Sequence, residues 1–311
     1  MSSTNIGIPI PPKFNFRRTA RSHGWYALPP FSITPDRDEL YRTLLLADGT
    51  VVHTTMRENG KDIRVTMQSG RPLRAAQKVE VCRQLATCLR LDEDFSDFHT
   101  QARRYPEFRW IATSGSGRML CSPTVFEDTV KMICTTNCTW ALTTLMVTNL
   151  VQAFGKRSGD AIAFPTPDAI AGSSEKFLRA DIKTGYRSPY IIELARKVVE
   201  GKANLEDWRN SPLSTHELFK QMKTVKGVGP YAAGNIMKLI GRYDYLGLDS
   251  WVRAKYYELH RNGRIVKDST IERHYKQLGK WRGLFFWMEM TRYWHDDKFQ
   301  AVKKDGWNES R

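Results

Sequence analysis

Two short stretches in the second half of the chain decide its fold. The first runs Val225-Lys226-Gly227-Val228-Gly229-Pro230-Tyr231-Ala232-Ala233-Gly234, and the second runs Leu246-Gly247-Leu248-Asp249-Ser250-Trp251. Gly227 and Gly229 permit a tight or left-handed backbone, and Pro230 suits the first position of a helix. The first stretch therefore predicts a sharp turn that leads directly into a helix.

The residues on either side of this turn predict two helices. Ser214 and Glu217 have the spacing of a capping box, which predicts a helix from about Thr215 to Thr224. After the turn, apolar residues recur at helical spacing, and Gly241 is a suitable stop. This apolar face consists of Ala233, Ile236, Met237 and Ile240. The pattern predicts two helices joined by a glycine hairpin over about residues 215–241.

The chemistry of such a hairpin lies at the start of its second helix. Backbone N–H groups and the positive end of the helix dipole there can hold a phosphate oxygen without contacting a base. Asp249 follows Tyr231 by 18 residues and precedes a helix that begins at Ser250. Taken alone, a Gly-x-Gly turn is ordinarily a plain helix connection and such an Asp is ordinarily an N-cap. Both interpretations stay open.

Together, the two stretches resemble the helix-hairpin-helix, Gly/Pro-Asp (HhH-GPD) superfamily of DNA base-excision glycosylases. The family motif is a Leu-Pro-Gly-Val-Gly hairpin followed by a catalytic Asp, and here Lys226 replaces the Pro. The resemblance implies that Asp249 is the catalytic acid and that the hairpin residues bind DNA. Those hairpin residues are Gly227, Val228 and Gly229.

Tyr231 stands where family members that also nick the DNA backbone have a Lys. A Lys forms a Schiff base with the sugar, which a phenol cannot do. The resemblance therefore implies a monofunctional glycosylase, with Tyr231 and Trp140 as candidate walls of the base pocket. A bifunctional lyase that uses Lys226 or Lys223 is one alternative, and a non-catalytic DNA-binding scaffold is another.

Two further stretches resemble the family, and the first of them resembles the branch that acts on 8-oxoguanine. One extends from Phe126 to Gly155 and includes Asn137, which would fill the gap in the duplex. The other contains Tyr186 and Arg187, which would wedge into the base stack and face the orphaned base. Taken by themselves, these two residues would more often be a half-buried aromatic and a solvated charge, and the three matches in order favour the functional roles. Ser122 and Pro123 are expected to open the helix that carries Phe126.

The N-terminal third has a different pattern from the rest. Short β-branched runs are broken at Asp48-Gly49 and Asn59-Gly60, which are hairpin signals. With the resemblance, this implies an α+β protein. Residues 1–112 are expected to form a mixed, mainly antiparallel β lobe, packed on an all-helical HhH-GPD glycosylase domain over residues 113–311.

Composition limits the partners and the compartment. Among 311 residues, Lys and Arg outnumber Asp and Glu by 48 to 33, giving a net charge of +15 that suits double-stranded DNA. No apolar run is long enough to span a membrane, and no secretory signal is evident. A monomer in the cytoplasm, associated with the nucleoid, is expected.

The cysteines and the main-chain carbonyls of the hairpin indicate which cofactors to expect. Five cysteines without a Cys-x-x-Cys pair indicate neither a disulfide framework nor a zinc site. The iron-sulfur branch of the family has a C-terminal four-cysteine cluster that this chain lacks. No cofactor is expected, apart from a structural Na⁺ or K⁺ that main-chain carbonyls near Val225 and Val228 would hold, as in relatives.

The expected reaction follows from these residues. The enzyme would flip one nucleotide out of the duplex and stack its base on aromatic side chains. Asp249 would stabilise positive charge at C1′ and orient or deprotonate the attacking water. The abundant aromatic residues favour alkylated purines as substrates, with oxidised guanine next. A hypermodified base in phage-type DNA, which would make this a defence enzyme, stays open.

Overall fold

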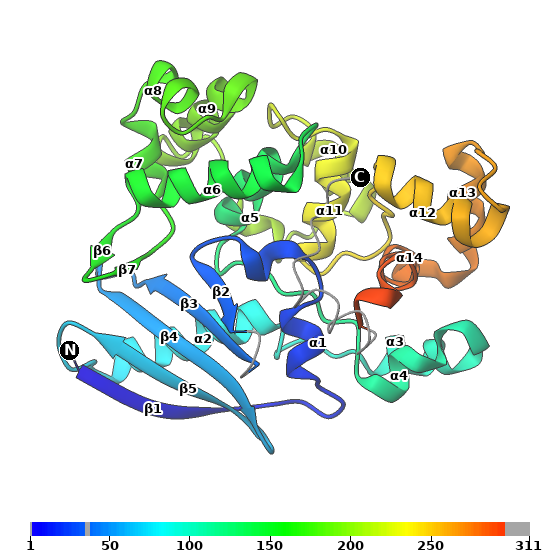
Figure 1. Ribbon diagram of the computed structural model, residues 1–311, viewed down its shortest axis with the longest axis horizontal. Helices are drawn as coiled ribbons and strands as arrows, with labels where there is room; N and C mark the ends of the chain where they lie inside the picture. Colours follow the sequence, from blue (N-terminus) through cyan, green and yellow to red (C-terminus); the bar gives the residue numbers. More distant parts are fainter. Residues whose placement is uncertain (1, 35–37, 296–311) are drawn as a thin grey trace. The chain divides into compact units, whose positions relative to one another are not determined.

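A computed structural model describes residues 2–34 and 38–295 (Figure 1). Its contacts group the chain into two compact units, each built from two stretches of sequence. The first unit combines the described residues up to Glu93 with Arg118–Trp208. The second combines Asp94–Gly117 with the described residues from Arg209 onward. The domain boundary drawn between residues 112 and 113 stays a prediction about the sequence.

The first unit contains an antiparallel sheet. Among the described residues it has five strands in the order β1-β5-β4-β3-β2. The strands are β1 (Ser2–Pro9), β2 (Phe31–Thr34), β3 (Glu39–Leu45), β4 (Val51–Asn59) and β5 (Asp62–Ser69). Gly49 and Gly60 have φ of 82° and 67°, in the two turns that connect β3 to β4 and β4 to β5. The two predicted hairpins are therefore confirmed.

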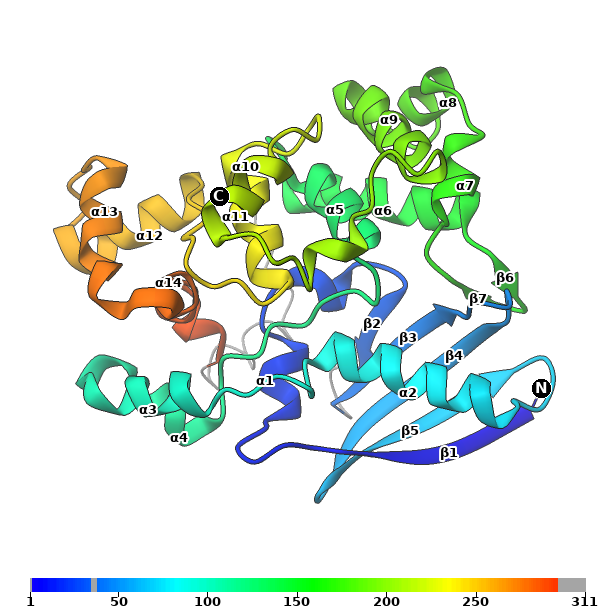
Figure 2. The same cartoon turned by 180° about the vertical axis from the view of Figure 1, so that it is seen from behind.

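Helices complete the first unit. They are α1 (Phe16–Ala20), α2 (Ala75–Leu89), α5 (Val125–Thr135), α6 (Trp140–Phe154), α7 (Pro167–Ala171), α8 (Glu175–Ala180) and α9 (Ser188–Val199). Figure 2 shows α2 lying across one face of the sheet, where the Gln84 side chain donates to the carbonyl of Leu45. The α+β class is confirmed.

Two local expectations need correction in this unit. Helix α5 begins after Thr124 rather than at Ser122-Pro123, because the Thr124 hydroxyl accepts a hydrogen bond from the Glu127 amide at 3.2 Å. The region expected to be all-helical also contains a small hairpin, β6 (Arg157–Ser158) and β7 (Ala161–Ile162). Strands of two residues are too short to show the alternating pattern by which strands are recognised.

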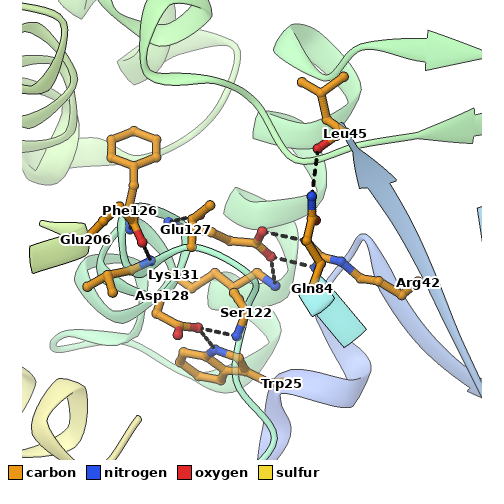
Figure 3. A network of polar contacts seen from close by, with 12 residues as sticks. Trp25, Arg42, Leu45, Gln84, Ser122, Phe126, Glu127, Asp128, Lys131 and Glu206 are labelled. Atoms are coloured by element: carbon orange, nitrogen blue, oxygen red, sulfur yellow. Dashed lines mark hydrogen bonds and ion pairs between the residues drawn. The ribbon is translucent and has the colours of Figure 1, made fainter. Parts of the chain in front are cut away.

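A buried ionic cluster ties the sheet to α5 within this unit (Figure 3). The Arg42 guanidinium on β3 donates to both carboxylate oxygens of Glu127, at 2.7 and 2.6 Å. The Lys131 ammonium, one turn further along α5, lies 2.7 Å from the same carboxylate. All three side chains are at most 3% exposed, so Glu127 is the counter-charge for two buried cations.

The neighbouring Asp128 has a structural partner as well. Its Oδ1 atom accepts hydrogen bonds from the Trp25 indole at 2.7 Å and from the Ser122 amide at 2.9 Å (Figure 3). Trp25 is 3% exposed, so this N-terminal aromatic is a packing residue. The acidic pair that follows Phe126 thus builds the core of the first unit.

The second unit is helical. Its helices are α3 (Ser96–Arg104), α4 (Arg109–Ser114), α10 (Thr215–Met222), α11 (Pro230–Leu239), α12 (Ser250–Arg261), α13 (Asp268–Tyr275) and α14 (Arg282–Met290). Aromatic side chains link the two stretches of sequence, since the Phe98 ring lies 4.6 Å from that of Phe285. The Trp281 indole also donates to Asp97 at 2.8 Å. Residues 94–117 are therefore helical partners of the C-terminal region.

Candidate functional site

The predicted glycine hairpin is present in the second unit. Ser214 and Glu217 form a capping box at the start of α10. The side chain of each accepts a hydrogen bond from the backbone N–H of the other. Gly227 has a φ of 87°, which a residue with a β-carbon rarely adopts. Helix α11 then begins at Pro230, and its N-cap Gly229 provides no side-chain cap. The hairpin over about residues 215–241 is confirmed, with α10 ending at Met222 (Figure 1).

The three hairpin residues assigned to DNA binding differ in exposure. Val228 is only 3% exposed, and its amide donates to the Val225 carbonyl at 3.0 Å. Gly229 is exposed, and a β-carbon built on it would meet no atom within 4 Å. Val228 therefore anchors the turn, and Gly229 is the residue whose backbone a phosphate can approach. Their roles in binding stay predictions.

The same carbonyl bears on the proposed cation. Because the Val225 oxygen already accepts a bond from Val228, it can offer a cation only its second lone pair. A carbonyl with a hydrogen bond can still be a ligand for a hard cation. The Val225 carbonyl can therefore still accept a Na⁺ or K⁺ ion, and a cation site at the turn stays a prediction.

Asp249 is placed by the start of α12. Its Oδ1 accepts a hydrogen bond from the Val252 amide at 2.8 Å, so it is the N-cap of the helix. Burial raises the pKa of the Asp249 carboxyl above its ordinary value. Two kinds of interaction oppose that shift and lower the pKa. They are the hydrogen bonds from the Val252 and Trp251 amides and the positive charges of Lys238 and Arg253. A capping role and a chemical role are compatible, because the bond from the Val252 amide goes to Oδ1 alone.

The segment that carries Asp249 packs closely against α11. A β-carbon on Gly234 would lie 2.9 Å from the Cα atom of Gly247, so the two backbones approach as only glycines allow. The Lys238 ammonium donates to the Leu246 carbonyl at 2.7 Å. On the other side, the Gly283 amide at the start of α14 donates to Tyr243 at 2.7 Å. These contacts fix the position of Asp249 relative to the hairpin helix.

Lys238 is a site residue that sequence reasoning missed. It is 0% exposed, and burial lowers the pKa of its ammonium group to about 7, against the opposing charge of Asp249. A signal was present in the sequence, because Lys238 interrupts a run of apolar residues. That run is Ile236-Met237-Lys238-Leu239-Ile240.

A cluster of tryptophans, also missed, begins two residues after Asp249. Trp251 is 37% exposed, and its ring stacks on that of Trp294 with centroids 5.4 Å apart. The Trp287 ring lies 6.3 Å from Trp251. Through its contact with Trp251, Trp294, which lies 45 residues after Asp249 in the sequence, packs at the N-terminus of α12. The three rings form one aromatic cluster at the N-terminal end of α12, with Trp251 as its exposed member.

Tyr231 lies in the first turn of α11 and is half-buried. Its carbonyl accepts a hydrogen bond from the Asn235 side chain at 3.0 Å. Of the two lysines that the lyase alternative invokes, Lys226 is exposed in the turn. Lys223 is the C-cap residue of α10, and its ammonium lies 5.4 Å from the centre of the Phe219 ring.

The remaining predicted residues lie in the first unit. Asn137 is exposed with a φ of 47°, and its amide donates to the Tyr186 hydroxyl at 3.4 Å. Tyr186 is 44% exposed, as a wedge requires. Arg187 is only 3% exposed, and its guanidinium binds the backbone carbonyl of Thr136 and lies over the Tyr186 ring. The structure thus brings these three together, with Arg187 turned inward.

Trp140 is the first residue of α6 and is half-buried. Its ring covers Gly24, since a β-carbon there would lie 2.3 Å from the indole. The structure therefore gives Trp140 a packing contact within the first unit. Its assignment as a pocket wall stays a prediction, as do the roles of Asn137, Tyr186 and Arg187.

The fold and the hairpin define a helix-hairpin-helix protein with an acid at the start of the helix that follows the hairpin, α12. The chain matches the model of the HhH-GPD superfamily base excision DNA repair proteins over residues 130–284, which include the hairpin and Asp249. This chain belongs to the HhH-GPD superfamily. No helix of the described residues is long and apolar enough to cross a membrane.

Solved structures with the same fold have been described. A 3-methyladenine DNA glycosylase from Archaeoglobus fulgidus superposes with a TM-score of 0.74 at 18% identity, covering 94% of this chain and 99% of that one. An 8-oxoguanine glycosylase/lyase from Clostridium acetobutylicum, solved with double-stranded DNA, gives 0.62 at 18% identity, covering 92% and 93%. The Schizosaccharomyces pombe 3-methyladenine DNA glycosylase Mag1 gives 0.51 at 17%, covering 63% and 96%.

Proposed function

We propose that this protein is a monofunctional DNA glycosylase that removes a damaged or modified base from double-stranded DNA and leaves an abasic site. The observation that carries the proposal is the position of Asp249. Its carboxylate is partly buried at the start of α12, on a segment packed against the hairpin helix α11. Membership of a base excision repair family supports DNA as the substrate.

The reaction divides between the hairpin and the acid. The uncapped start of α11 holds a phosphate through backbone N–H groups, while the target nucleotide rotates out of the duplex. The bond between C1′ and the base nitrogen breaks, and the base departs with the electron pair. The Asp249 carboxylate stabilises the positive charge that develops on the sugar. Water then bonds to C1′ and loses its proton to the carboxylate or to solvent.

Tyr231 supports hydrolysis without strand cleavage. A lyase needs an amine that forms a Schiff base with the sugar, and a phenol cannot form one. Lys238 lies on the same face of α11 two turns further on, and its complete burial keeps it from the sugar. The nucleophile in this proposal is therefore water.

The tryptophan cluster bears on the substrate. An alkylated purine carries positive charge and stacks favourably on indole rings such as those of Trp251, Trp287 and Trp294. We place alkylated purines first and oxidised guanine next, in line with the activities named for the structural neighbours. A hypermodified base in foreign DNA is a further candidate, which would give the enzyme a defence role.

The proposal also includes the setting in which the enzyme works. A net charge of +15 favours a polyanionic partner such as double-stranded DNA. We propose that the enzyme acts as a monomer in the cytoplasm, on nucleoid DNA. Na⁺ or K⁺ at the hairpin carbonyls would supply charge for the bound phosphate.

The test is base release from duplexes that contain alkylated purines, 8-oxoguanine, uracil or hypermodified cytosines. The wild-type protein is compared with Asp249→Asn, which keeps the N-cap because Asn caps as well as Asp does. We expect release by the wild type alone, with strand breaks only after alkali. Near-normal release by the variant would remove Asp249 from the mechanism.

Two other outcomes would support the alternatives. Borohydride trapping of a covalent complex with DNA would show an amine nucleophile and favour the bifunctional lyase. Tight binding to every duplex without release of any base would favour the non-catalytic scaffold.

A further inference from the structure

We propose that Lys238 is a positioning residue for Asp249, whose buried ammonium group holds the 246–249 segment against α11 and keeps the Asp249 carboxylate ionised. The inference rests on the proposed function of Asp249 as the catalytic acid. It assigns a purpose to a buried charge that the reaction itself does not use.

The geometry around Lys238 carries the first part of the proposal. The side chain is 0% exposed, and its ammonium donates to the Leu246 carbonyl at 2.7 Å. A β-carbon on Gly247 would lie only 2.7 Å from that nitrogen and 3.1 Å from the Asn235 side chain. Lys238 therefore reaches from α11 into the backbone of the segment that ends at Asp249.

The charges carry the second part. Burial lowers the pKa of Lys238, and the negative charge of Asp249 raises it, so Asp249 favours the protonated amine. In return, Lys238 and Arg253 favour the ionised carboxylate against the effect of burial. Arg253 also forms a pair with Asp268 at 2.8 Å, so its charge is shared. Each member of the Lys238–Asp249 pair thus stabilises the charged form of the other.

Packing alone does not explain a lysine here. A buried charge is costly, and an apolar side chain of similar volume is often at least as stable at such a position. Lys238 is also unsuited to attack the sugar. It lies seven residues beyond Tyr231, which corresponds to about 10 Å along the helix axis, with no exposed surface.

The first experiment compares Lys238→Met and Lys238→Gln. Glutamine keeps an N–H donor for the Leu246 carbonyl without the charge, whereas methionine removes both. Single-turnover base release is measured against pH for each variant, together with DNA affinity. Lys61→Gln, which changes an exposed lysine in the β4–β5 turn, is the matched control.

We expect the acid limb of the rate profile to move to higher pH in both Lys238 variants, because Asp249 is then protonated more readily. The rate falls roughly tenfold near pH 6 and less than about threefold near pH 8, with DNA affinity unchanged. Folded variants that both keep the wild-type acid limb would overturn the proposal.

A second measurement does not depend on activity or on the folding of Lys238 variants. The lysine Cε signals of protein labelled with carbon-13 are followed by NMR against pH, in the wild type and in Asp249→Asn. Coupling between two sites is reciprocal, so loss of the Asp249 charge must lower the pKa of Lys238. We expect the wild-type Lys238 signal to titrate near pH 7 and to shift downward in the variant.

Identical titration in the two proteins would refute the coupling. If the wild-type enzyme releases no base from any duplex, the proposed function fails while this measurement still reports on the pair. The two failures are therefore distinguishable.

Discussion

The buried Glu127 cluster gives a quantitative prediction for Glu127→Gln. The substitution keeps the shape of the side chain and removes the counter-charge of two cations, Arg42 and Lys131. Removing one partner of a buried pair costs about 3–5 kcal/mol, because the remaining charge stays desolvated. Two cations lose their partner here, so we expect a loss of about 4–5 kcal/mol in the free energy of unfolding at pH 7.

The assay is urea denaturation of both proteins, in which a loss of this size lowers the midpoint by roughly 1–2 M. Glu175→Gln is the matched control, since Glu175 pairs with Arg179 at 2.6 Å while both side chains are half-exposed. That pair contributes no more than about 0.5 kcal/mol. If Glu127→Gln lies within about 1 kcal/mol of the wild type, the reasoning about the cluster is wrong.

The pH dependence provides a second check. Burial would raise the pKa of Glu127, but the charges of Arg42 and Lys131 outweigh it and lower that pKa to about 2. The folded protein therefore binds fewer protons than the unfolded chain between the ordinary glutamate pKa and about 2. The contribution is complete at neutral pH and is lost as the pH falls through this window. The gap between wild type and Glu127→Gln should narrow from pH 5 to pH 3.

Three further substitutions test other parts of the structure. Gly24→Ala places a β-carbon 2.3 Å from the Trp140 ring, so it should lower the free energy of unfolding by about 1–3 kcal/mol and change the tryptophan fluorescence. An unchanged urea midpoint would contradict this contact. Gly229→Ala has room for its β-carbon and should leave stability unchanged, yet weaken DNA binding roughly tenfold in a fluorescence anisotropy titration if a phosphate approaches this backbone. Burial and the charge of His260 lower the pKa of His274. Below the ordinary histidine pKa the unfolded chain therefore binds more protons than the folded protein, and stability should fall as the pH falls from 7 to 5. His274→Gln should flatten this part of the plot of urea midpoint against pH.

The hairpin could be predicted from the sequence because its determinants are local. The Ser214 capping box, the left-handed Gly227 and the spacing of the apolar residues on α11 all act within one or two turns. The same is true of Asp249, which caps the helix that begins at the next residue. Such features need no knowledge of distant contacts.

The burial of Lys238 and of Arg187 could not be predicted, because the environments of these two side chains are not local. A lysine in a helix is ordinarily solvated, and Lys238 is buried only because Gly247 brings the 246–249 segment against α11. The Arg187 guanidinium binds the carbonyl of Thr136, 51 residues earlier, and this contact holds the side chain inward. The packing of α3 is likewise not local, because Asp97 on this helix accepts a hydrogen bond from Trp281, far along the chain.

The order in which the chain is made has a consequence for its folding. The chain passes between the two units after Glu93, Gly117 and Trp208, so α3 and α4 leave the ribosome well before the rest of their unit. The hydrogen bond between Asp97 and Trp281 spans 184 residues. At ordinary translation rates that separation amounts to roughly 10–40 s. For that time Phe95, Phe98 and Phe108 lack the later aromatic residues against which they pack, Tyr243 and Phe285, and these exposed rings suit temporary protection by a chaperone.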